Sequence, residues 1–174
     1  MWEFSNKLVD HFVPPKARDE WSSYMMVRTF VFLHLFGPLL GHSVIFFLYS
    51  ASEQIGWVFW ALEINLCFFW LMPFLVRRTG GLTLPATLTV QALVTLSLFG
   101  SFFYGGISSP FLPWLLITPI LAFFYLPSTG LVRDGLLALM IANVLAFSGL
   151  VITGFEFPAV DLEMFQFIGI VSTM

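Results

Sequence analysis

The sequence predicts an all-α protein, a polytopic membrane bundle of six transmembrane helices preceded by a short interfacial helix. Of the 174 residues, 59% are hydrophobic and only 10% are charged, whereas soluble proteins carry about 25% charged residues. So few charged side chains cannot cover the surface of a water-soluble domain. The apolar residues also fall in runs of roughly 20, the length at which a helix crosses about 30 Å of hydrocarbon.

Residues 1–27 are predicted to form a cytoplasmic interfacial helix and a linker. The apolar residues of this segment recur at helical spacing: Trp2, Phe4, Leu8, Val9 and Phe12. Pro14 and Pro15 end the periodic run, because proline cannot continue a helix. An unstructured tail is the alternative, since so short a segment forms a marginal helix without a membrane to lie on.

Residues 28–174 are predicted to form the transmembrane domain. Six apolar stretches are candidate spans: 28–50, 55–76, 83–104, 111–126, 131–153 and 160–174. Short connections rich in turn residues separate them, so consecutive helices should be antiparallel neighbours. The last stretch reaches only about 22 Å as a helix. We therefore expect it to continue beyond Met174 into a cytoplasmic domain, and a short sixth helix that ends at the interface is the alternative.

The positive charges orient the predicted bundle. The seven basic residues are Lys7, Lys16, Arg18, Arg28, Arg77, Arg78 and Arg133. All of them lie on one side of the membrane if the N-terminus is cytoplasmic, which is the arrangement that the positive-inside rule favours. The net charge is −3 and the basic residues form no cluster. Nucleic acid is therefore not an expected partner.

Ionisable residues inside the predicted spans are the first candidates for a functional site, because they are costly in hydrocarbon. They are His34, His42 and Glu63. His42 and Glu63 lie at equal distances from the first outer loop, about 12 Å below the helix ends, so two adjacent helices could bring them together. We expect this pair to bind polar atoms of a ligand or to respond to protonation, with a structural role as the alternative. His34 should bind a backbone carbonyl.

Other polar residues at this level are expected to join helices rather than to bind a ligand: Ser97, Thr118, Asn143 and Gln166. A metal site is not expected, because His34 and His42 lie roughly 12 Å apart along the helix axis. The single cysteine, Cys67, has no second cysteine with which to form a metal or redox pair. No catalytic sequence motif occurs, so we expect no catalytic residues.

The outer loop between the third and fourth spans is the most distinctive candidate site. Its glycines allow tight turns, and irregular backbone at this depth is tolerated where protein buries it or where it lines a cavity. Short hydroxyl donors and aromatic ring faces suit a planar, carbonyl-bearing ligand. An aromatic belt around an ordinary turn is the alternative. The predicted ligand-binding residues are Tyr104, Gly105, Gly106, Ser108, Ser109, Pro110, Phe111 and Trp114, together with His42 and Glu63.

Residues 105–111, Gly-Gly-Ile-Ser-Ser-Pro-Phe, resemble the GGxxNPF motif of the redox-responding global-regulator histidine kinases of purple bacteria. In the six-helix membrane domain of that family, the motif occupies the same outer loop and is linked to ubiquinone. The resemblance carries over to Gly105, Gly106, Pro110 and Phe111. Ser109 stands where the family has asparagine, and a serine hydroxyl can still bind a carbonyl although it lacks the amide donor.

The wider sequence pattern is similar to the membrane domains of many proteobacterial sensor kinases. This resemblance implies a sensor domain in the bacterial inner membrane that detects a hydrophobic small molecule or the quinone redox state in the outer half of the bilayer. It would control a cytoplasmic histidine kinase through helix six, as a homodimer that signals to a response regulator. Ubiquinone is the implied ligand. The alternatives are the membrane domain of a nucleotide cyclase and a non-catalytic subunit of a larger membrane complex.

Overall fold

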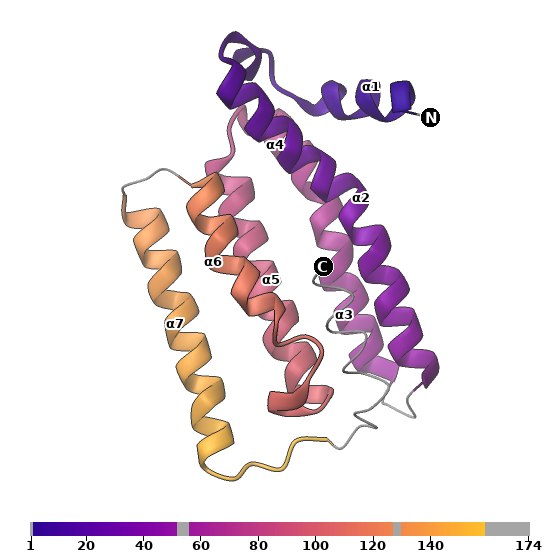
Figure 1. Cartoon of the computed structure of the whole chain (residues 1–174), viewed down its shortest axis with the longest axis vertical. Helices are drawn as coiled ribbons and strands as arrows, with labels where there is room; N and C mark the ends of the chain where they lie inside the picture. The colour runs from indigo at the N-terminus through magenta and orange to yellow at the C-terminus, as the bar shows by residue number, and fades with distance from the viewer. Residues whose placement is uncertain (1, 52–55, 127–129, 159–174) are drawn as a thin grey trace.

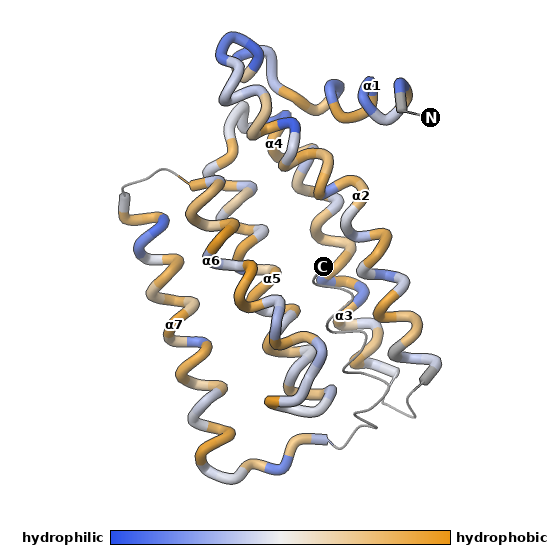
Figure 2. Tube along the Cα trace, in the orientation of Figure 1, coloured by the Kyte–Doolittle hydropathy of each residue, from blue (hydrophilic) through white to orange (hydrophobic). Residues whose placement is uncertain are grey.

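The computed structural model describes residues 2–51, 56–126 and 130–158, and every regular element in these ranges is a helix. Helices run side by side to form the bundle, and α1 lies across one end of it (Figure 1). The most hydrophilic stretches gather at the end that carries α1, while the middle of the bundle is mainly apolar (Figure 2). The predicted all-α class is therefore confirmed over the described residues.

The N-terminal helix α1 (Trp2–Phe12) forms where the apolar periodicity predicts it and stops before Pro14. It is followed by a short 3-10 helix, η1 (Pro15–Asp19). Val9 and Phe12 are buried, whereas Phe4 on the other side of α1 is exposed. The helix contacts α2 and α4, and His11 contacts Arg77 of α4. This segment is therefore a helix docked on the bundle and not an unstructured tail.

The first long helix, α2 (Trp21–Ala51), begins earlier than the predicted start at Arg28. No helix-breaking residue separates the two positions, and the extended backbone of Glu20 sets the new start. Pro38 lies inside α2. Because proline has no amide hydrogen, the carbonyl of His34 loses its partner within the helix.

The second predicted span is one continuous apolar helical segment, Gly56–Thr79, made of three consecutive elements. They are α3 (Gly56–Phe68), a 3-10 turn η2 (Phe69–Leu71) and α4 (Met72–Thr79). Pro73 explains the break, since it cannot donate to the carbonyl of Phe69. The segment ends at Gly80, whose φ of +70° places it in the left-handed region that commonly ends a helix.

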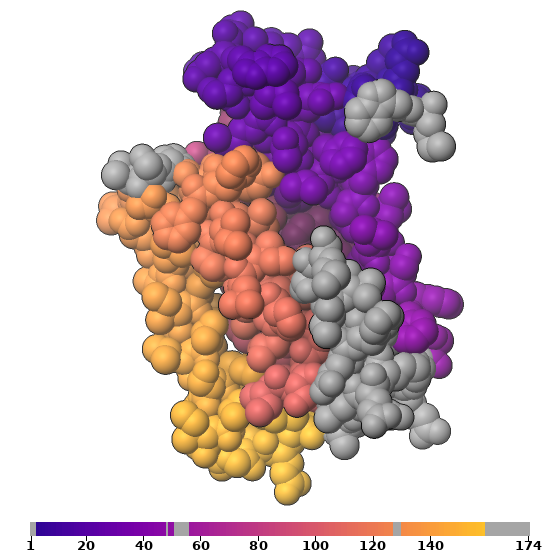
Figure 3. Space-filling view, viewed as in Figure 1, coloured from indigo at the N-terminus to yellow at the C-terminus, as the bar shows by residue number. Residues whose placement is uncertain are grey.

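Helix α5 (Thr83–Phe103) is the central helix of the bundle. Half of the residues in its most apolar stretch are buried, whereas only 17% are buried in the corresponding stretch of α7 (Leu131–Ile152). Helix α7 lies at one edge of the bundle (Figure 3). α5 contacts α3, α4, α6 and α7. Its buried positions include small residues that let neighbouring helices approach closely: Ala86, Ala92, Ser97, Gly100 and Ser101.

Within the described residues, four helical segments are long and apolar enough to cross a membrane: Trp21–Phe47, Gly56–Thr79, Thr83–Phe103 and Leu131–Ile152. The predicted fourth span, 111–126, is shorter as a helix, because α6 runs only from Trp114 to Tyr125. Two prolines, Pro110 and Pro113, keep the residues before Trp114 in turns. The predicted sixth span, 160–174, lies outside the described residues. The chain is thus compatible with a multi-pass membrane protein, and large apolar side chains such as Leu40 and Leu116 face outward.

Candidate functional site

His42 of α2 and Glu63 of α3 meet between two of the segments that are long and apolar enough to cross a membrane. The imidazole Nδ1 contacts the carboxyl Oε2, and the two side chains are 22% and 15% exposed. The contact needs one proton, carried either by the imidazole or by the carboxyl group. The equal depth of the two residues in the sequence thus corresponds to a direct contact in the structure.

The helix crossing beside this pair depends on Gly41. A Cβ at this position would lie 2.7 Å from Cδ2 of Leu66 on α3. Only a residue without a side chain lets Leu66 pack against α2 so closely, which is how small residues act at helix contacts in membranes. Gly41 therefore leaves room for the Leu66 side chain at the crossing where His42 meets Glu63.

Cys67 lies one turn beyond Glu63 on α3, and Trp70 follows in η2, two turns beyond Glu63. The Trp70 indole N–H donates to the carbonyl of Leu35 at 3.2 Å. Its ring lies 4.9 Å, centroid to centroid, from that of His42. Sequence reasoning missed both neighbours, although their spacing from Glu63 is the signal that could have found them.

Both ring nitrogens of His34 form hydrogen bonds within the bundle. Its Nδ1–H donates to the carbonyl of Phe30 at 2.7 Å, and Nε2 forms a hydrogen bond with the Thr89 hydroxyl at 2.8 Å. The imidazole is buried and stacks on the Phe30 ring. The predicted bond to a backbone carbonyl is confirmed. His34 ties α2 to α5 and takes no part in the contact between His42 and Glu63.

The predicted loop site is a tight turn that begins after α5. Gly105 and Gly106 have φ values of +90° and +60°, a region that glycine enters without steric cost. The amides of Ser108 and Ser109 donate to the carbonyls of these two glycines, each at 3.2 Å. The Ser109 hydroxyl then accepts from the Phe111 amide at 3.2 Å. Glycine and serine therefore specify the turn, as the sequence indicates.

Two of the predicted aromatic walls lie in the protein core. Phe111 is only 6% exposed and Tyr104 only 1%. A Cβ on Gly100 would lie 2.5 Å from Cγ of Phe111, so this ring fills the space that the glycine leaves on α5. Ser109 and Pro110 are buried as well. Of the predicted ligand-binding residues in this segment, Gly105, Ser108 and Trp114 are half-buried and keep accessible surface.

Two of the remaining polar residues at this level form hydrogen bonds within their own helix. The hydroxyls of Ser97 and Thr118 each donate at 2.7 Å to a carbonyl of their own helix, at Leu93 and Leu115. Asn143 is half-buried on α7, and Gln166 lies outside the described residues. The predicted bonds between helices are therefore replaced, for Ser97 and Thr118, by bonds within one helix.

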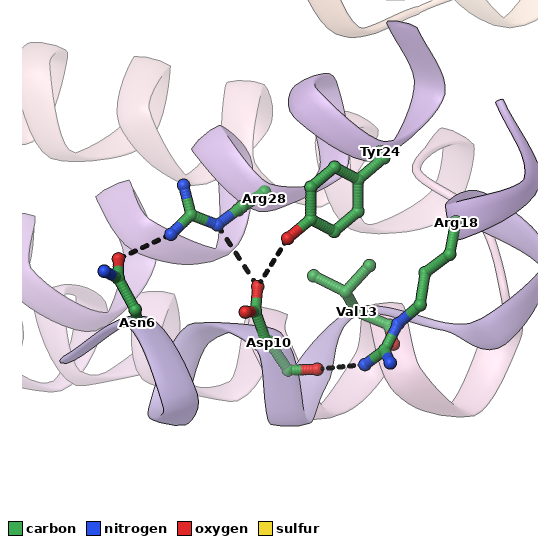
Figure 4. Close-up of polar contacts among 6 residues, drawn as sticks. All are labelled: Asn6, Asp10, Val13, Arg18, Tyr24 and Arg28. Atoms are coloured by element: carbon green, nitrogen blue, oxygen red, sulfur yellow. Dashed lines mark hydrogen bonds and ion pairs between the residues drawn. The ribbon is translucent and has the colours of Figure 1, made fainter. Parts of the chain in front are cut away.

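A polar network that sequence reasoning did not find joins α1 to α2 (Figure 4). Oδ1 of Asp10 accepts from the Tyr24 hydroxyl at 2.9 Å and from Nε of Arg28 at 3.1 Å. The Arg28 guanidinium also donates to Oδ1 of Asn6. From η1, the Arg18 guanidinium donates to the backbone carbonyl of Asp10 at 2.6 Å. Asp10 is thus the centre of the contact that holds α1 against α2.

Removing the Asp10 carboxylate should release α1. We expect Asp10→Ala to cost about 1–2 kcal/mol of folding free energy, because Tyr24 and Arg28 lose a partly buried acceptor. Protease cleavage within α1 should accelerate in protein held in lipid nanodiscs. Glu3→Ala is the matched control, since its ion pair with Lys7 is highly exposed and such pairs contribute little. Equal cleavage of both variants would show that the network does not anchor α1.

No protein-family model, curated protein or solved structure matches the chain. The α2–α3 contact and the resemblance of residues 105–111 are the features of the chain that bear on its function.

Proposed function

We propose that this chain is the membrane input domain of a sensor histidine kinase that responds to a hydrophobic, carbonyl-bearing small molecule. The observation that carries the proposal is the His42–Glu63 contact inside the spans. Ionisable residues at such depth are uncommon unless they serve binding, proton movement or switching. The kinase output and the quinone as leading ligand come from the resemblance of residues 105–111.

Helix α2 is suited to carry the signal. It holds His42 at one level and Arg28, which contacts Asp10 of α1, nearer its N-terminal end. A ligand that binds more tightly to one of two positions of α2 against α3 would shift the population of these positions. Movement of α2 would then reach α1, and in a homodimer the kinase would be reached through the predicted sixth span, 160–174, which lies outside the described residues.

The charge distribution supports a cytoplasmic N-terminus in a bacterial inner membrane. His11 of α1 contacts Arg77 of α4, so the basic residues of both segments lie at one end of the bundle. The most hydrophilic stretches of the chain gather at that end (Figure 2). Basic residues concentrate on the cytoplasmic side of membrane proteins.

The quinone head group would contact the turn at residues 105–114. Gly105, Ser108 and Trp114 keep accessible surface there. Ser108 can donate a hydrogen bond to a carbonyl, and the Trp114 indole offers a ring face. Ser109 is buried and accepts a bond from the Phe111 amide, so it supports the turn from inside.

Photolabelling tests the ligand. A photoreactive quinone should label the wild-type protein in membranes, and Trp114→Ala should reduce the labelling several-fold because the ring face is lost. Trp60→Ala is the matched control, since Trp60 is an exposed side chain on α3. Equal labelling of the wild type and both variants would leave the turn as a structural element only.

Kinase output is tested separately in inverted membrane vesicles that contain the product of the complete gene. Autophosphorylation should differ between an oxidised short-chain ubiquinone and its quinol. A response in the wild type that Glu63→Gln weakens would support the proposal. A gene product without phosphotransfer, or one whose phosphorylation ignores the quinone, would contradict it.

A further inference from the structure

We propose that His42, Glu63 and Cys67 form a binding site for a divalent transition-metal ion, with Zn²⁺ the first candidate. One ligand atom of each residue lies within 4.8 Å of the other two. The inference goes beyond the proposed sensor function, because it concerns a second ligand class and would hold for a protein with another output. It also revises the expectation of no metal site, which considered His34 and His42 and left Cys67 aside.

The geometry of the three side chains suits one ion. Glu63 and Cys67 are four residues apart on α3, a spacing that puts two side chains on one helix face. His42 approaches from α2, where Gly41 permits the close helix contact. Zinc holds nitrogen, oxygen and sulfur ligands at about 2.0–2.3 Å, so ligand atoms around it lie roughly 3–4 Å apart. Small rotations about side-chain bonds would bring the three atoms to that separation.

The imidazole of His42 is already oriented as a ligand. Its Nδ1 atom contacts Oε2 of Glu63, so both atoms face the same point. A metal ion bound between them would take the place of the proton that they share, and the imidazole would carry its own proton on Nε2. Trp70 packs against the same ring.

Charge balance favours a divalent ion at this depth. A neutral imidazole, one carboxylate and one thiolate together offset two positive charges, so the loaded site carries no net charge into the hydrocarbon. On binding, the S–H bond of Cys67 is replaced by a bond from sulfur to the metal. The proton leaves to water, and no oxidant or reductant is needed.

The mixture of ligand atoms selects the kind of metal. Calcium and magnesium prefer oxygen ligands throughout, whereas thiolate and imidazole favour zinc and related transition metals. Three protein ligands leave a fourth position on a tetrahedral ion. A water molecule or a small anion would complete it.

Cobalt substitution tests the site directly, because Cys67 is the single cysteine of the chain. Any thiolate-to-cobalt charge-transfer absorption must therefore come from this residue. We expect the purified protein in detergent micelles, without a histidine tag, to show this absorption on titration with Co²⁺ and to lose it when Zn²⁺ is added. Cys67→Ser should abolish the absorption, and its exposed position makes misfolding of this variant unexpected.

The two other ligands are tested by affinity. His42→Ala and Glu63→Gln should each weaken Co²⁺ binding at least about tenfold, while His11→Ala, outside the cluster, should leave it unchanged. Circular dichroism verifies that each variant is folded, and Glu63→Gln, which preserves shape, decides the outcome if His42→Ala is not folded. A wild type without the absorption, or affinity that ignores both substitutions, would overturn the site. Because the assay contains neither quinone nor kinase, its failure would leave the sensor proposal standing.

Discussion

Phe111→Ala should destabilise the bundle by about 3–5 kcal/mol, the usual cost of removing a buried phenylalanine ring. The ring fills the space over Gly100 of α5 and lies beside Tyr104, with ring centroids 5.7 Å apart. Its loss would leave a cavity between α5 and the turn that leads to α6. Unfolding in a mixed-micelle titration with a denaturing detergent measures the change.

The matched control for this substitution is Phe46→Ala. Phe46 lies on α2 and is 64% exposed, so its ring packs against lipid in the folded protein. We expect this variant to unfold within about 1 kcal/mol of the wild type, as is usual away from the core. A Phe111→Ala protein as stable as the Phe46→Ala protein would mean that the turn is not part of the core.

The His42–Glu63 contact should show strong coupling in a double-mutant cycle. His42→Ala and Glu63→Gln should each cost about 1.5–3 kcal/mol, the range for hydrogen bonds to charged groups. The double variant should cost less than the sum of the two, with a coupling energy between about 0.5 and 3 kcal/mol. Unfolding is followed with a chelator present, so that metal binding does not enter the comparison.

A second cycle on Arg133 and Asp134 provides the control. These residues form an ion pair at 3.4 Å on α7, and the Asp134 side chain is 65% exposed. Exposed pairs of this kind contribute between about 0 and 1 kcal/mol, so their coupling should be small. If the free-energy changes of the His42 and Glu63 substitutions were also strictly additive, the two groups would act independently.

Counting along the sequence was enough to find the features that repeat regularly or lie at a fixed depth. Hydrophobic length predicted the helices of the bundle, and periodicity predicted α1. His42 and Glu63 lie at equal distances from one loop, and this predicted that they lie at the same depth. The pattern of glycine and serine predicted the turn after α5. Each of these inferences uses only the rise per residue, the spacing of apolar side chains or the backbone freedom of glycine.

Other features depend on how the helices are rotated and how they cross, which the chain order does not state. The start of α2 at Trp21 and the docking of α1 are supported by Asp10, whose partners Tyr24 and Arg28 are distant in sequence. The burial of Phe111 depends on Gly100, a residue of another helix.

The sequence alone therefore determined an all-helical, apolar chain with an acid and an imidazole at one level of its spans. Only the tertiary structure decided that Cys67 and Trp70 join them and that Phe111 belongs to the core. The physical reason is that hydrophobicity drives a helix into the membrane but does not set its rotation about its own axis. That rotation is fixed by close contacts between neighbouring helices, such as Gly41 against Leu66.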